Sequence, residues 1–247
     1  MIIANWKCNG SKSMISEWFS EFSLNYIETN ESFIGIAPPS IYIENVLANI
    51  STKLIGVNIG SQDIDTSSGA RTGAISSEMI LDYGCKFSII GHSERRQFYN
   101  ESNNDIRQKI LNIANKTLTI LCIGETEEEN KNDLTKDVLK KQLEVIEEID
   151  FDDSLVIAYE PVWAIGTGNT PTPDNINEIH KFIKDVVQST STNSEIPLVL
   201  YGGSVNEDNA ENFFKEEFVD GALIGGASLE GKQFANIINI YNGINSK

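Results

Sequence analysis

The sequence predicts an α/β protein folded as a single (β/α)8 barrel, and two observations favour this fold. Short apolar runs recur eight times along the 247 residues, a length typical of one such barrel. Each run is nearly continuous in apolar residues, as expected for strands buried on both faces of a parallel sheet. A doubly wound open sheet is the second candidate. No linker or low-complexity tract divides the chain, so we expect one domain over residues 1–247.

The eight predicted strands are short, and longer polar or amphipathic stretches separate them. In chain order they are MIIANW (1–6), FIGIAP (33–38), LIGVNIG (54–60), FSIIG (87–91), LTILCIG (118–124), LVIAYEP (155–161), PLVLYGG (197–203) and DGALIGG (220–226). Alternation of such strands with helical intervals is typical of repeated βαβ units.

Three intervals show the three-four spacing of apolar residues that predicts amphipathic helices, namely residues 172–187, 231–243 and 134–149. Their buried stripes are expected at Ile176, Ile179, Ile183 and Val187, at Phe234, Ile237, Ile238 and Tyr241, and at Leu139, Leu143 and Ile146. We interpret the acidic stretch 125–133 as a solvated helix face.

The composition excludes several classes of partner. A net charge of −17 argues against binding to nucleic acid or to an anionic membrane surface, which both need clustered Lys and Arg. No apolar run is long enough to span a bilayer, and no signal peptide is evident. The three cysteines are widely spaced without a metal-type pattern, so we expect no metal site and a cytoplasmic location.

Polar residues follow several of the predicted strands. Asn5 and Lys7 follow the first, His92 and Glu94 follow the fourth, and Glu160 ends the sixth. Glycine turns end the seventh and eighth strands. The carboxyl ends of barrel strands meet on one face, where chemistry occurs in this fold. The set suits proton transfer on a small phosphorylated substrate, although each residue alone has a structural interpretation, such as a salt bridge for a strand-end glutamate.

Longer motifs are more specific than these single residues. The segments NWKCNG, GHSERR, CIGE, AYEPVWAIGTG, YGGSV and IGGASL resemble the triosephosphate isomerase family, in that family's order and from the first strand to the last. The resemblance implies a cofactor-free homodimer that interconverts dihydroxyacetone phosphate and D-glyceraldehyde 3-phosphate through an enediol(ate), in glycolysis and gluconeogenesis.

The resemblance also implies the role of each catalytic residue. Glu160 is expected to be the base that moves the carbon-bound proton. His92 is expected to polarise the carbonyl as a neutral imidazole, kept neutral by a helix N-terminus beside it. Lys7 would place positive charge near the enediolate oxygen, and Asn5 would help to orient the same oxygens. Glu94 matches a family residue beside the site.

A lid and a phosphate cradle are implied in the same way. The lid covers Pro161, Val162, Trp163, Ala164, Ile165, Gly166, Thr167 and Gly168. Its closure would bring Ile165 against Glu160, strengthen the base by desolvation and keep water from the intermediate. The cradle comprises the N–H of Gly166, the hydroxyl of Ser204 and the N–H groups of Gly225 and Gly226.

The segment SSGARTGAIS (67–76) departs from the family pattern at Arg71 and Ala74, where an aromatic residue and a glutamate are usual. In the family this loop enters the partner subunit, with the residue matching Thr72 near the other active site. Ala74 removes a carboxylate that could pair across the interface with Arg95. Asp63 stands where asparagine is common, and Cys8 matches a position close to the interface.

Two other functions stay open on the sequence alone. A different isomerase of phosphorylated sugars could use the same barrel and the same cradle. A non-catalytic phosphate-binding protein is the other class, and the joint presence of Asn5, Lys7, His92 and Glu160 argues against it.

Overall fold

The strands close into a barrel. A computed structural model describes the chain except residues 30–31, 54–55, 152, 165–170, 191–195 and 246–247. The strands pair in parallel and in chain order, and β1 also pairs with β8. They are β1 (Ile2–Asn5), β2 (Ile34–Ala37), β3 (Val57–Ser61), β4 (Phe87–Ile90), β5 (Leu118–Ile123), β6 (Leu155–Tyr159), β7 (Leu198–Tyr201) and β8 (Ala222–Ile224). The closed sheet confirms the predicted (β/α)8 barrel and excludes the open sheet.

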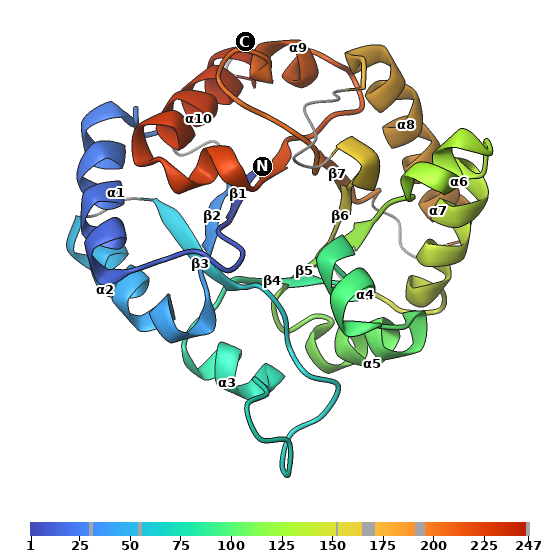
Figure 1. Cartoon of the computed structure of the whole chain (residues 1–247), viewed down its shortest axis with the longest axis horizontal. Helices are drawn as coiled ribbons and strands as arrows, with labels where there is room; N and C mark the ends of the chain where they lie inside the picture. The colour runs from blue at the N-terminus through green and yellow to red at the C-terminus, as the bar shows by residue number, and fades with distance from the viewer. Residues whose placement is uncertain (30–31, 54–55, 152, 165–170, 191–195, 246–247) are drawn as a thin grey trace.

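Helices form a ring around the strands (Figure 1). The α-helices are α1 (Lys12–Asn25), α2 (Ile43–Lys53), α3 (Ser77–Asp82), α4 (Ser93–Tyr99), α5 (Asn103–Ile113), α6 (Glu127–Lys131), α7 (Thr135–Leu143), α8 (Pro173–Thr190), α9 (Ala210–Phe214) and α10 (Gly231–Asn245). Short 3-10 turns are η1 (Ser40–Tyr42), η2 (Glu144–Ile146), η3 (Val162–Ala164) and η4 (Gly226–Leu229).

The core has two layers because successive strand residues point to opposite faces. On β1, Ile3 belongs to the cluster that includes Phe87 of β4, inside the barrel. Its neighbours Ile2 and Ala4 belong to the larger cluster between strands and helices, with Trp18 of α1. Burial on both faces explains why the strands are apolar without alternation.

The predicted helical stripes are largely confirmed. Ile176, Ile183, Val187, Phe234, Ile237, Ile238, Leu139, Leu143 and Ile146 are buried. Ile179 and Tyr241 are only half-buried. The Tyr241 hydroxyl donates a hydrogen bond to the carbonyl of Asp220 at 2.9 Å.

Some predicted boundaries are wrong. β3 starts at Val57, later than the run that was expected to form it. The helix predicted over 134–149 ends at Leu143, and η2 continues it as a tighter turn that closes with the N–H of Glu147 bonded to the carbonyl of Glu144. In α6 Glu127, Glu128 and Lys131 are exposed, but Glu125 at the start of the acidic stretch is fully buried, so the prediction of a solvated face fails for this residue.

A long loop, residues 62–76, joins β3 to α3 and projects away from the barrel (Figure 1). The bond from the Asp65 N–H to the carbonyl of Ile75, 2.7 Å long, closes the base of the loop. Thr72 lies exposed near its tip. Within the described part of the chain, no helix has the length and apolar content needed to cross a membrane.

Candidate active site

The carboxyl ends of the strands surround a cavity of about 490 Å³. Asn5 and Lys7 reach it from the end of β1, His92 from β4 and Glu160 from β6. The rest of its wall comes from the turns after β7 and β8. Several residues predicted from the sequence thus line one cavity, namely Asn5, Lys7, His92, Glu160, Ser204, Gly225 and Gly226.

Glu160 faces His92 inside this cavity. Its Oε1 atom lies 2.9 Å from Nε2 of His92, and its Oε2 atom accepts the N–H of Ser93 at 3.0 Å. Both carboxylate oxygens therefore have a partner, although only 1% of the residue is exposed. The contact with Ser93 was not predicted from the sequence, since it uses the backbone of α4.

The surroundings keep Glu160 ionised. Burial, the largest single effect, raises the pKa of Glu160, but the ring of His92, the Ser93 N–H and the charge of Lys7 together lower it below its ordinary value. A carboxylate that stays ionised can accept a proton, as a general base must.

The start of α4 determines which nitrogen of His92 carries the proton. His92 is the N-cap of α4, and its Nδ1 accepts the N–H of Glu94 at 3.2 Å. In the neutral ring the proton is therefore on Nε2, which faces Glu160. Burial lowers the pKa of His92, whereas the Glu160 carboxylate raises it, and the net direction is upward while these groups are in contact.

Lys7 is fixed in both backbone and side chain. Its φ angle is 50°, and its N–H donates to the side-chain oxygen of Asn5 at 3.0 Å. Its Nζ atom lies 2.7 Å from Oε1 of Glu94. Gln62, which follows β3, donates to the Lys7 carbonyl at 2.9 Å and was not predicted from the sequence. The lysine ammonium is thus held at the edge of the cavity next to His92.

The first residues of the predicted lid are anchored to a buried acid. Pro161 and η3 follow β6, and the ring N–H of Trp163 donates to Glu125 at 2.8 Å. The Tyr159 hydroxyl donates to the same carboxyl at 3.1 Å. Burial raises the pKa of Glu125, and these donors oppose the shift. Glu125 was assigned to a solvated face, yet its position directly after a strand could have indicated a role at this end of the barrel.

The remaining lid residues are described only in part. Ala164 is buried, and its carbonyl accepts the Ser204 hydroxyl at 2.9 Å, so the lid base contacts the predicted cradle. The predictions for Ile165, Gly166, Thr167 and Gly168 lie outside the described residues.

Two glycines allow the backbone of Glu160 to lie where it does. A Cβ atom on Gly124 would lie 1.8 Å from the carbonyl oxygen of Glu160. A Cβ atom on Gly202 would lie 2.8 Å from Cγ of Glu160. Neither position has room for a side chain, because real Cβ atoms do not approach other heavy atoms so closely.

A second cavity, of about 430 Å³, adjoins the first and shares Asn5, Lys7 and His92 with it. It is lined also by Cys8, Asp63, Gly73, Ala74 and Arg95. Within the chain, Nε of Arg95 lies 2.9 Å from Asp63. Arg71 pairs with Asp65 at 2.5 Å. Ala74 was expected to leave Arg95 without a carboxylate partner across the interface. Arg95 instead pairs with Asp63 within its own chain.

Fold and site together define a (β/α)8-barrel enzyme whose acid and base groups meet at the carboxyl ends of the strands. A family model described as "Triosephosphate isomerase" matches residues 1–241. The chain belongs to the triosephosphate isomerase family.

Curated relatives named "Triosephosphate isomerase" agree over nearly the whole chain. The protein of Klebsiella pneumoniae is 39% identical over 244 residues, which cover 96% of this chain and 95% of the relative. That of Baumannia cicadellinicola is 43% identical, with the same coverage of 96% and 95%. That of Buchnera aphidicola is 44% identical over 97% of this chain and 96% of the relative.

Proposed function

We propose that this chain interconverts dihydroxyacetone phosphate and D-glyceraldehyde 3-phosphate, a step of glycolysis and gluconeogenesis, with residues 1–247 acting as one catalytic domain. Membership of the family supports the reaction. The observation that carries the mechanism is the contact of Glu160 with His92 in a cavity that also contains Lys7. We propose that the protein needs no cofactor, because proton transfers alone accomplish the isomerisation.

In this proposal Glu160 is the base. One carboxylate oxygen leaves Ser93 or His92, takes the proton from the substrate carbon next to the carbonyl, and returns it to the neighbouring carbon. Over the whole reaction one proton moves from one substrate carbon to the next, and one proton moves between the oxygens on these two carbons. The low pKa of Glu160 in the free protein rises when the partners are lost and the lid excludes water, which makes the base stronger at the step that uses it.

His92 and Lys7 act on the oxygens in this proposal. Nε2 of His92 carries a proton that can be donated to the carbonyl oxygen, and Nδ1 stays occupied by the N–H of Glu94. Once Glu160 moves toward the substrate carbon, the main cause of the raised pKa of His92 is gone, which favours the neutral ring. The ammonium of Lys7 stabilises the negative charge on the enediolate, and Asn5 orients the oxygens.

We place the phosphate at the turns that follow β7 and β8. The Ser204 hydroxyl and the N–H groups of Gly225 and Gly226 line the cavity there, and we add Gly166 from the family pattern. Backbone dipoles bind phosphate even in an acidic protein. The lid, residues 161–168, would close over the substrate and protect the enediolate from losing phosphate.

We further propose a cytoplasmic homodimer in which the loop 62–76 enters the partner and Thr72 approaches its active site. The projection of this loop and the second cavity beside Lys7 support the proposal, since the cavity offers space next to catalytic residues. Exposed Phe98 and Tyr99 on α4 add apolar surface.

A coupled dehydrogenase assay tests the function directly. Purified protein should convert each triose phosphate into the other and should leave pentose phosphates unchanged. Conversion of a pentose phosphate but not of trioses would favour another sugar-phosphate isomerase. Binding of phosphate compounds without turnover would favour the non-catalytic alternative.

A further inference from the structure

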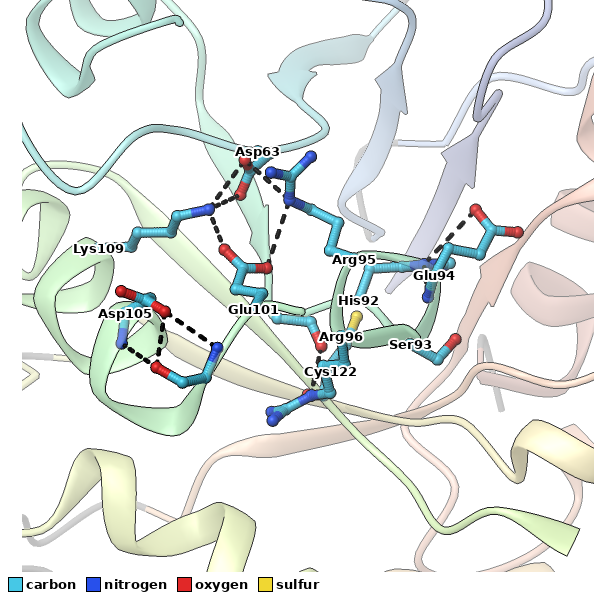
Figure 2. A network of polar contacts seen from close by, with 12 residues as sticks. Asp63, His92, Ser93, Glu94, Arg95, Arg96, Glu101, Asp105, Lys109 and Cys122 are labelled. Carbon is cyan, nitrogen blue, oxygen red and sulfur yellow. Dashed lines mark hydrogen bonds and ion pairs between the residues drawn. The ribbon is translucent and has the colours of Figure 1, made fainter. Parts of the chain in front are cut away.

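Four charged side chains form a cluster beside the active site (Figure 2). Asp63 follows β3, Arg95 lies on α4, Glu101 lies between α4 and α5, and Lys109 lies on α5. The Lys109 ammonium lies 2.7 Å from Asp63 and also contacts Glu101, while Nε of Arg95 lies 2.9 Å from Asp63 and 3.3 Å from Glu101. Asp63 is therefore bound to both cations at once.

Arg95 connects this cluster to the catalytic groups. Its backbone N–H donates to the carbonyl of His92 at 2.8 Å, within the first turn of α4. Glu94, its neighbour in that turn, contacts the ammonium of Lys7 at 2.7 Å. The side chain that pairs with Asp63 therefore comes from the same helical turn as His92 and Glu94.

Gln62, which directly follows β3, also contacts Lys7. Gln62 donates to the carbonyls of Lys7 and Ala37, at 2.9 and 2.8 Å. The next residue is Asp63. Gln62 thus contacts the backbone of Lys7, while Asp63 contacts Arg95 in the first turn of α4. These two consecutive residues fix the two segments relative to each other.

We propose that Asp63 is a positioning residue for the isomerisation: through Arg95 it holds His92 and Glu94 in the arrangement that the reaction requires. The inference rests on the proposed function. Although asparagine is common at this position in the family, in this chain the carboxylate of Asp63 balances the charge of Lys109, whose side chain is only 5% exposed. Without Asp63, Glu101 alone would face two cations, and an uncompensated charge that is largely buried is costly.

The charge of Asp63 changes within a pH range that assays can reach. Burial raises the pKa of Asp63 to about 6, and the charge of Glu101 adds to the shift, while Lys109 and Arg95 oppose it. Among the described residues, these three groups, from α4, α5 and the segment between them, are the charged groups that face the carboxyl. Below that pH, protonated Asp63 has nearly the shape and charge of asparagine.

The test compares kcat and KM of the wild type and Asp63→Asn from about pH 5 to about pH 8, where both enzymes are assayed with the same substrate. We expect kcat of the variant to be about tenfold lower at neutral pH, with KM changed much less, because small displacements of catalytic groups slow the reaction. The ratio of the two kcat values should fall toward one below pH 6. Titration of the substrate cancels in this ratio.

A ratio of one at every pH would overturn the inference, and so would a reduction that is independent of pH, since that marks a merely structural role. A wild type without isomerase activity would instead refute the proposed function. If Asp63→Asn does not fold, Arg95→Gln breaks the same link and should show the same pH-dependent ratio. Asp185→Asn, which alters an exposed pair with Lys181 on α8, is the matched control and should leave kcat unchanged.

The oligomeric state must be followed in the same samples, because Asp63 and Arg95 line the second cavity. Sedimentation should give the same mass for the variant and the wild type. A loss of kcat that disappears at higher enzyme concentration would show that Asp63 acts on assembly, and would overturn the positioning role.

Discussion

The Nε2 atom of His92 lies 2.9 Å from Oε1 of Glu160, so the two groups that we propose to exchange protons with the substrate are partners in the free protein. The contact helps to keep Glu160 ionised, while the N–H of Glu94 on Nδ1 leaves the proton of the neutral His92 ring on Nε2, toward Glu160. In the proposed mechanism the contact has to break before Glu160 reaches a substrate carbon, which would couple substrate binding to activation of the base.

Glu160→Ala should lower kcat by about 10³-fold or more, because a positioned base and its charge are both lost. KM should change little, since the phosphate contacts remain. The coupled assay measures both values, and circular dichroism should show an intact barrel. Glu178→Ala, an exposed change on α8, is the control and should retain full activity. Near-normal turnover of Glu160→Ala would mean that another residue is the base.

Trp163→Phe should loosen the base of the lid, because it removes the ring N–H bond to Glu125 and keeps an aromatic ring. We expect the free energy of unfolding to fall by about 1.5–3 kcal/mol, the usual contribution of one hydrogen bond to a charged group. More of the intermediate should lose its phosphate. Quantifying inorganic phosphate released per turnover checks this, and an unchanged ratio would argue against a protective role of the lid.

His180 should make the protein less stable in acid. Burial lowers the pKa of His180 to about 3, and its Nδ1 contacts the carbonyl of Phe218 at 3.1 Å. The unfolded chain protonates this residue near its ordinary pKa of about 6.5, so the free energy of unfolding falls as the pH drops from there toward 3.

The slope that His180 contributes approaches about 1.4 kcal/mol per pH unit. Denaturant unfolding of the wild type and His180→Gln at several pH values measures it. The variant should be less stable at neutral pH but should lose less stability on acidification. Equal slopes in both proteins would show that other groups cause the acid sensitivity.

Replacing residues 67–73 by a short glycine linker should yield monomers, because this segment carries the tip of the projecting loop. Activity should fall in parallel if Thr72 supports the partner's site. Analytical ultracentrifugation gives the mass, with the wild type as reference. A wild type that is monomeric at assay concentration would contradict the proposed dimer.

The barrel could be predicted from the sequence because its strands, such as that containing Ile3, are buried on both faces and therefore read as continuous apolar runs. Residues just after strands, such as His92 and Glu160, could also be predicted, because the fold brings strand ends together. The particular contacts of Glu125 and Asp63 could not be predicted, since they depend on partners from other segments, Trp163 for one and Arg95 for the other. No local pattern encodes such contacts.

The tight fit of Gly124 and Gly202 against Glu160 has a consequence for attempts to redesign this enzyme. A saturation library at either codon should return almost solely the parental glycine, whatever substrate is selected for. Directed evolution toward a new sugar would therefore have to substitute other residues in the neighbouring turns, where changes do not displace the carboxylate.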